Sequence, residues 1–184
     1  MTHNDPVTIR IATAGDNVRL AEFGAQAFAD SFAADNRPED MAAYLAESFS
    51  PEKQAAELAA PNSVFLIAEI GGEMAGFARL LEDPAPAGVT GRRPLELVRI
   101  YAGKQWIGRG VGAALMQACL VEAARRGCDT LWLGVWEHNL RAQAFYRKWG
   151  FTVAGTQPFR LGADLQTDLV MQRPVDAPEP GRTP

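Results

Sequence analysis

Short segments in which apolar and polar residues alternate predict several β-strands. Residues 131–136, Leu-Trp-Leu-Gly-Val-Trp, follow the two-residue period of a mostly buried strand. The segments 64–70 and 74–81 flank Gly71 and Gly72, a pair of residues that favours a hairpin turn. The predicted strands are residues 7–12, 64–70, 74–81, 95–102, 130–136, 151–157 and 165–173.

Longer segments repeat apolar residues at helical spacing. Within residues 16–32, the apolar side chains of Leu20, Phe23, Ala27 and Phe28 fall on one side of a helix. Proline at a first helical position and glycine after a last turn indicate where other helices begin and end. The predicted helices are residues 16–32, 38–49, 50–60, 110–126 and the segment between the N-cap Asn139 and Gly150.

The order of these elements predicts one mixed α/β domain over residues 7–173, because helices and strands intermix around a single sheet. Residues 83–94 hold three prolines and two glycines and are predicted to be a loop. Residues 1–6 are predicted to be a flexible start, and residues 174–184 a proline-rich flexible tail.

Composition and charge narrow the classes of function. A net charge of −4 and a pI of about 5.2 argue against a nucleic-acid partner. No apolar run approaches the roughly 18 residues that a membrane span needs, and the first residues lack the apolar core of an export signal. We therefore expect a cytoplasmic protein without a membrane partner, in which Cys119 and Cys128 are free buried thiols.

Two segments carry candidate chemistry, and the first is the helix that begins after Asn139. Asn139 and Tyr146 are seven residues apart, which is two helical turns, so they share a face with Ala142 between them. An amide, a small residue and a phenol in line predict a groove through which an elongated ligand passes.

The second segment is the glycine-rich stretch before residues 110–126. Backbone N–H groups at a helix start, with no side chains in the way, can bind an anion such as a pyrophosphate. Residues 108–113 also fit the dinucleotide fingerprint Gly-x-Gly-x-x-Gly/Ala, with Glu137 as a ribose-binding acid. Too little chain follows Glu137 for a doubly wound sheet, which argues against that alternative. A purely structural glycine cluster is the third interpretation.

Together these segments resemble the GNAT (Gcn5-related N-acetyltransferase) superfamily. The family pattern Asn-x-x-Ala-x-x-Phe-Tyr-x-x-x-Gly-Phe is complete here as Asn139, Ala142, Phe145, Tyr146, Gly150 and Phe151. The resemblance covers roughly residues 7–173. Within the superfamily the chain is most similar to bacterial spermine/spermidine N-acetyltransferases, which have similar Gly-Val-Trp-Glu-x-Asn and Gln-Thr-Asp-Leu-x-Met runs.

The resemblance implies a mostly antiparallel sheet of six to seven strands flanked by helices, with residues 95–102 and 130–136 splayed apart to admit acetyl-CoA as co-substrate. The family glycine loop fits in two registers, beginning at Gln105 or at Ile107, and the second has the usual spacing to strand and helix. The implied cofactor-binding residues are Ile100, Tyr101, Ala102, Ile107, Gly108, Arg109, Gly110, Val111, Gly112 and Asn139.

The resemblance also implies catalytic roles. Tyr146 would be the general acid, although an aromatic side chain at this position could simply pack against the sheet. Glu96, eleven residues before Ile107, would be the base through a water molecule, unless it is a solvated strand start. Glu137 is the second candidate base, or a charge that complements the helix dipole. We expect His138, one of two histidines, on the surface, and no metal site.

Acidic residues gather at the junction of the first two predicted helices, which shapes the acceptor pocket in the family: Asp30, Asp35, Glu39 and Asp40, with Phe28, Phe32 and Tyr44 nearby. This composition suits a polyamine, although helix starts collect acids in any protein. The expected reaction is acetyl transfer to a primary amine by direct attack in a ternary complex. The alternative acceptors are protein N-termini, lysines and another small amine. The alternative outside enzymes is an acyl-CoA-binding sensor. A homodimer is a possible assembly.

Overall fold

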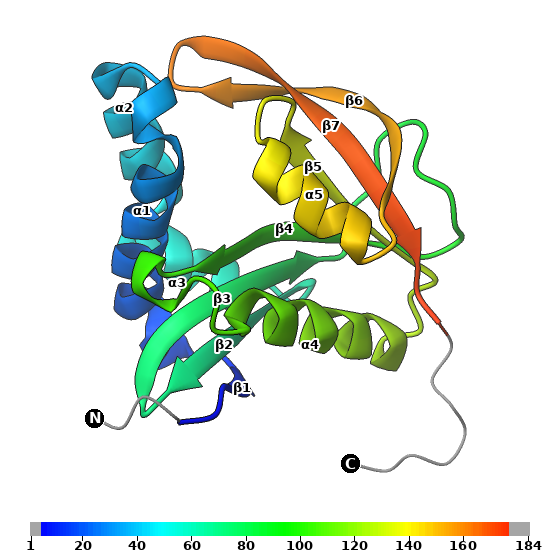
Figure 1. The fold of residues 1–184 in the computed structure, drawn as a ribbon, viewed down its shortest axis with the longest axis horizontal. Coiled ribbons are helices and arrows are strands. Elements are labelled where there is room, and N and C mark those ends of the chain that lie inside the picture. The colour runs from blue at the N-terminus through cyan, green and yellow to red at the C-terminus, as the bar shows by residue number, and fades with distance from the viewer. Residues whose placement is uncertain (1–4, 177–184) are drawn as a thin grey trace.

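The fold is taken from a computed structural model that describes residues 5–176 (Figure 1). Its helices are α1 (Asn17–Phe32), α2 (Pro38–Ser48), α3 (Pro51–Ala59), α4 (Val111–Arg125) and α5 (Leu140–Lys148), with short 3-10 turns at Ala14–Asp16, Ala33–Asp35 and Lys104–Trp106. Its strands are β1 (Thr8–Ile11), β2 (Ser63–Ile70), β3 (Glu73–Leu81), β4 (Pro94–Ala102), β5 (Thr130–Trp136), β6 (Thr152–Leu161) and β7 (Asp164–Pro174).

Every predicted helix and strand is present, and the differences lie at the ends. Strand β6 continues to Leu161 rather than ending at Gln157. It contains Pro158, which an outer strand tolerates because the missing N–H of proline is not needed on the open side. Strand β7 includes Pro174, so the sheet extends one residue into the predicted tail. Residues 177–184 of that tail and residues 1–4 of the predicted start lie outside the described residues.

The sheet has seven strands in the order β1-β2-β3-β4-β5-β7-β6, and every neighbouring pair is antiparallel except β4 and β5. This arrangement confirms the predicted mixed α/β fold. The parallel pair joins only residues Pro94–Glu96 to Thr130–Trp132. Figure 1 shows β4 and β5 close together on the right and separating toward the left, where α1 and α2 lie.

A β-bulge accompanies this separation. Leu80 pairs with Leu97 and Arg79 with Arg99, so Val98 is an extra residue in β4. Such a bulge bends its strand and increases the local twist. Strand β4 stays paired with β3 as far as Ala102, and within residues 5–176 no strand pairs with its other edge after Glu96. The predicted splaying of the two central strands is therefore confirmed.

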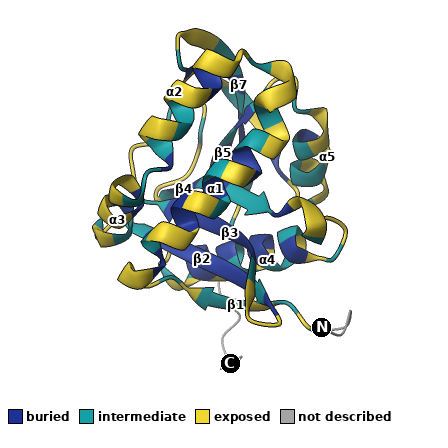
Figure 2. Cartoon of the chain, turned by 90° about the vertical axis from the view of Figure 1, so that its left-hand side faces the viewer, coloured by how far each residue is buried: buried dark blue, intermediate teal, exposed yellow. Residues whose placement is uncertain are grey.

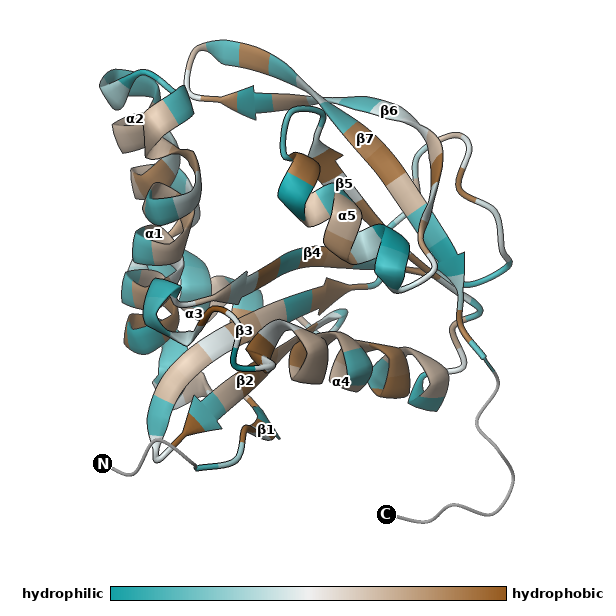
Figure 3. Cartoon of the chain, viewed as in Figure 1, coloured by the Kyte–Doolittle hydropathy of each residue, from teal (hydrophilic) through white to brown (hydrophobic). Residues whose placement is uncertain are grey.

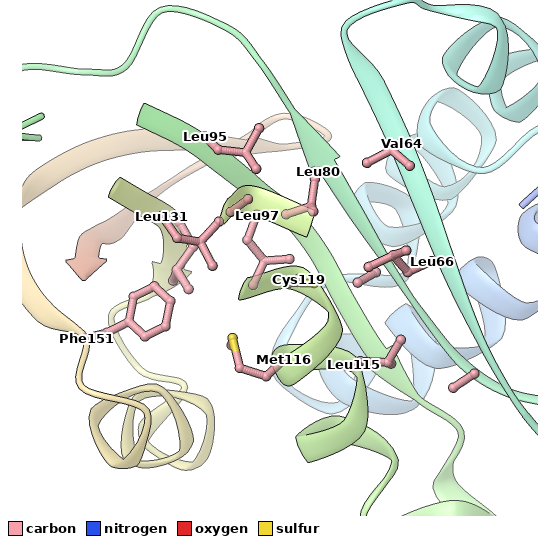
Figure 4. Packing of buried hydrophobic residues seen from close by; sticks show 14 of the residues in the cluster. Val64, Leu66, Leu80, Leu95, Leu97, Leu115, Met116, Cys119, Leu131 and Phe151 are labelled. Carbon is pink, nitrogen blue, oxygen red and sulfur yellow. The ribbon is translucent and has the colours of Figure 1, made fainter. Parts of the chain in front are cut away.

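Two hydrophobic clusters hold the layers together, one on each face of the sheet. The first packs α4 against β2–β5 and includes Leu97, Leu115, Met116, Leu131 and Phe151 (Figure 4). Its members include Cys119 and Cys128, which are free and buried as predicted.

The second cluster lies under α1 and α2 on the opposite face and includes Leu20, Phe28, Phe65 and Phe77. Polar and apolar residues both occur along α1 (Figure 3), and the helix turns its exposed residues outward (Figure 2). This is the amphipathic pattern that the sequence predicted for it. Within residues 5–176, no helix combines the length and the apolar character that crossing a membrane requires.

Candidate active site

A cavity of about 620 Å³ lies where β4 and β5 separate. Residues from α1, α2, β4, α4, β5, α5, β6 and β7 line it, so most elements of the fold contribute. Eight of the residues predicted for the site line this cavity: Glu96, Ile100, Tyr101, Ala102, Ile107, Gly112, Asn139 and Tyr146. Most of the predicted site residues therefore lie around this one cavity, and they come from residues 96–146 of the chain.

The glycine loop reaches the cavity at the beginning of α4. Gly108 and Gly110 adopt positive φ angles of 83° and 81°, which glycine reaches without strain. A Cβ atom built on either residue would meet nothing within 4 Å, so open space lies beside the loop. Helix α4 begins directly after Gly110, and its first turn contains no acidic residue. Its first N–H groups have no partner within the helix and suit an anion.

This geometry decides between the two registers of the loop. Because Gly110 is the N-cap, the register that begins at Ile107 places its last two glycines at the start of the helix. The side chain of Val111 is 1% exposed and packs in the core, so only its backbone can face a ligand. The guanidinium of Arg109 lies 5.1 Å from the ring centre of Trp106. The mostly antiparallel sheet excludes the doubly wound fold that a dinucleotide site of this type requires.

Helix α5 has the caps that the sequence predicted. The Asn139 side chain accepts a hydrogen bond from the backbone N–H of Ala142 at 3.1 Å, and Gly150 follows the helix with a φ of 82°. Asn139, Ala142 and Tyr146 all line the cavity, which confirms that they share a face. Burial raises the pKa of the Tyr146 phenol, so this group keeps its proton at neutral pH.

Glu96 is half-buried at the start of β4 and lines the same cavity. Burial raises the pKa of its carboxyl group to about 7, although the charge of Arg79 opposes this change. Glu96 is thus partly shielded from solvent, and its role as a base stays a prediction. Glu137 has a side chain that is 43% exposed and is absent from the cavity lining. His138 lies on the surface as predicted.

The prediction that four acidic residues shape the acceptor pocket is wrong for three of them. Asp40 is buried, pairs with Arg37 at 2.7 Å and accepts a hydrogen bond from the backbone N–H of Ala163 at 2.7 Å. It therefore ties α2 to the turn between β6 and β7. Asp35 and Glu39 are exposed and do not line the cavity, which leaves Asp30 as the member of this cluster that does.

Asp168 on β7 is a lining carboxylate that the sequence did not single out. It is 8% exposed and pairs through its backbone with Trp136 on β5 and Gln157 on β6. Burial raises the pKa of its carboxyl group to about 6. Asp168 belongs to the Gln-Thr-Asp-Leu-x-Met run that resembles polyamine acetyltransferases, and this run was the available signal. Its position beside the cavity depends on strand pairing.

Aromatic side chains surround this end of the cavity. The ring centres of Phe28 and Tyr44 are 4.5 Å apart, those of Tyr44 and Phe159 are 5.5 Å apart, and those of Phe32 and Trp136 are 6.3 Å apart. We call this part of the cavity the acceptor chamber and define it by Phe28, Phe32, Tyr44, Trp136, Phe159 and Asp168. The three aromatic residues predicted near the acceptor pocket are all in it.

Comparisons with known proteins agree with this arrangement. The sequence profile described as the acetyltransferase (GNAT) family matches residues 26–151. An uncharacterized N-acetyltransferase from Lactobacillus delbrueckii subsp. lactis is 38% identical over 148 residues, which is 80% of this chain and 86% of that protein. The N-alpha-acetyltransferase RimI of Mycobacterium tuberculosis is 30% identical and aligns with 89% of this chain and 91% of its own length.

Solved structures show the same fold. The PaiA N-acetyltransferase from Thermoplasma acidophilum, in complex with coenzyme A, has a TM-score of 0.74 at 21% identity, covering 92% of this chain and 99% of its own. A ribosomal-protein-alanine N-acetyltransferase from Brucella melitensis has a TM-score of 0.70 at 26% identity, covering 91% of this chain and 99% of its own. The chain therefore belongs to the GNAT family and is an acetyl-CoA-dependent N-acetyltransferase.

Proposed function

We propose that this enzyme acetylates the primary amine of a small cationic molecule, such as a polyamine, by direct attack in a ternary complex. The observation that carries the proposal is one cavity with two different ends. One end has the free helix start of α4, and the other has the buried carboxylate of Asp168 together with several aromatic rings. An anion suits the first end and an alkylammonium ion suits the second.

The donor end has room and donors for acetyl-CoA. We assign the pyrophosphate to the backbone N–H groups that follow Gly110 at the start of α4, because no side chain fills the space beside Gly108 and Gly110. The pantetheine arm is assigned to the unpaired edge of β4 at residues 100–102, where main-chain N–H and C=O groups lack a strand partner. Asn139 keeps its cap and also borders this end of the cavity.

The chemical step needs a neutral amine and a leaving group that gains a proton. Glu96 is proposed as the base that removes the proton from the acceptor ammonium ion, through a water molecule, since its pKa of about 7 suits proton uptake at neutral pH. The nitrogen then forms a bond to the acetyl carbon while the carbon–sulfur bond breaks. Tyr146 is proposed to donate its phenolic proton to the departing sulfur, and its neutral phenol fits that role. The new amide nitrogen then loses its extra proton, which restores the Tyr146 phenol, and Glu96 releases its proton to solvent.

A second candidate acceptor is the N-terminal amine of a protein. It is favoured by the 30% identity to the N-alpha-acetyltransferase RimI and by the 26% identity to the ribosomal-protein-alanine N-acetyltransferase of Brucella melitensis. In that case the acceptor chamber would hold the first residues of a peptide. The two candidates differ in what surrounds the reacting amine, because a polyamine carries further positive charges and a peptide carries amide groups.

A panel of amines separates the two candidates, with acetyl-CoA-dependent release of thiol as the readout. We expect spermidine and spermine to react faster than a peptide with N-terminal alanine and faster than a neutral-tailed amine of similar length. The advantage of the polyamines should fall as salt screens the carboxylates. A reaction with the peptide and none with polyamines would assign the enzyme to protein acetylation.

A further inference from the structure

Asp168 lacks the partner that a buried carboxylate normally has. Its side chain forms no hydrogen bond or ion pair with any residue in the described part of the chain, residues 5–176. Burying an unpaired charge is unfavourable, so such groups are usually paired, protonated or reserved for a ligand. The carboxylate faces the cavity, and a ligand in the acceptor chamber can therefore reach it.

The carboxylate of Asp168 lies against Gly134 of β5, next to the Gln157 side chain. A Cβ atom built on Gly134 would lie 2.9 Å from Asp168 Oδ2, so the carboxylate occupies space that glycine leaves open on β5. Burial is the main reason for the raised pKa values of Tyr44, Tyr101 and Tyr146, and the negative charge of Asp168 adds to each of them. Asp168 is thus within electrostatic reach of both Tyr146 and the chamber wall at Tyr44.

No cationic side chain within residues 5–176 forms an ion pair with this carboxylate. Arg99 also lines the cavity, but its guanidinium is bound by Glu57 at 2.6 Å and lies 4.9 Å from the ring centre of Phe49. The guanidinium of Arg99 therefore already has a carboxylate partner in Glu57. Lys104 and Arg141 also line the cavity, and neither forms an ion pair with Asp168. A positive charge on a ligand would supply the missing partner, and the aromatic rings of the acceptor chamber favour an alkylammonium ion.

We propose that Asp168 binds a second positively charged nitrogen of the acceptor, so that the enzyme selects diamines and polyamines over monoamines. The inference rests on the proposed function and adds the residue that carries its specificity. The reacting amine would lie toward Tyr146, and the second nitrogen would lie among the aromatic rings of the chamber. A charge-assisted hydrogen bond then holds the acceptor at two points.

Matched pairs of amines test this proposal. Putrescine and cadaverine each carry a second nitrogen that butylamine and pentylamine lack, with the same carbon chain. We expect the wild-type kcat/KM to be about tenfold or more higher for each diamine, since hydrogen bonds between charged groups are stronger than those between neutral groups. In Asp168→Asn the ratio should fall toward one, chiefly because KM for the diamine rises. Asp35→Asn removes the same charge from an exposed position outside the cavity and should keep the wild-type ratio.

Two results would overturn the role of Asp168. One is a wild-type enzyme that acetylates matched diamines and monoamines equally well, a comparison that needs no variant. The other is a folded Asp168→Asn variant that keeps the diamine preference. If the wild-type enzyme acetylates no amine at all, the proposed function fails instead. Calorimetric titration of putrescine and butylamine into the CoA complex then tests Asp168 by itself, and equal affinities would refute it.

Discussion

Glu57 and Asp168 are both buried carboxylates with 8% exposure, yet their surroundings are opposite. Glu57 on α3 binds Arg79 at 2.9 Å and Arg99 at 2.6 Å, so it joins a helix to two strands. Asp168 on β7 has a cavity beside it and no cation of the described chain. The first carboxylate is satisfied by the fold, and the second is available to a ligand.

This difference shows that burial without a partner identifies the site better than the number of acids in a segment does. The acidic helix junction around Asp40 is mostly structural or exposed, whereas Glu96 and Asp168 line the cavity with raised pKa values. A protein tolerates such unfavourable burial where function requires it. Substitutions in the ion pairs around Glu57 and in the cavity test this difference.

Removing the paired carboxylate should have the largest effect. Glu57→Gln leaves Arg79 and Arg99 buried without a counter-charge, and breaking a buried ion pair costs about 3–5 kcal/mol. Urea denaturation should show a fall of that size in the free energy of unfolding. Glu52→Gln on the exposed side of α3 is the control and should stay within about 0.5 kcal/mol of the wild type. Equal stability of the two variants would mean that the ion pairs do not hold α3.

The next effect concerns the proposed acid. Tyr146→Phe keeps the ring and its packing against Phe145 and Phe151, so stability and acetyl-CoA affinity should hardly change. The turnover number should fall toward the lower end of the about 10²–10⁴-fold range of general acid catalysis, because a CoA thiolate leaves easily. Single-turnover kinetics would measure this loss. A variant with the wild-type rate of the chemical step would make Tyr146 a packing residue.

A smaller effect is expected for the phosphate cradle. Gly110→Asp places a carboxylate beside the start of α4 and a side chain at a φ of 81°, where only glycine is unstrained. CoA binding measured by calorimetry should weaken by about tenfold or more, which is about 1.4 kcal/mol. Gly150→Asp has a similar φ of 82° at the end of α5 and controls for backbone strain. Unchanged CoA affinity in folded Gly110→Asp would remove the pyrophosphate from this loop.

The smallest effect is a dependence of stability on pH. The carboxyl groups of Glu96 and Asp168 have folded-state pKa values of about 7 and about 6, above the unfolded values of about 4. The folded state therefore binds their protons more tightly, and the free energy of unfolding should decrease as pH rises from about 4 to about 7. Asp168→Asn should then be more stable than the wild type at neutral pH, by on the order of 1 kcal/mol, and lose this advantage near pH 4. Thermal melts of Asp168→Asn and the wild type at both pH values measure this effect. If Asp168 were paired, the difference in stability between the two proteins would not change in this way with pH.

The sequence predicted those parts of the site that local geometry determines. Asn139 caps α5 through a residue three positions away, and Gly110 begins α4 by its own φ angle, so both follow from short motifs. Asp168 could not be placed in this way, because its partner Trp136 in β5 is 32 residues earlier in the chain and the register is set by the whole sheet. Asp40 was misassigned for the same reason, since Ala163 lies 123 residues away.

The central claim is that the acetyl donor and a cationic acceptor meet in the cavity where β4 and β5 separate. A crystal structure of the enzyme with CoA and spermidine tests it most directly. We predict phosphate oxygens at about 3 Å from backbone N–H groups at the start of α4, one spermidine nitrogen toward Tyr146, and another against Asp168. CoA bound away from the α4 start, or spermidine bound outside the acceptor chamber, would contradict the claim.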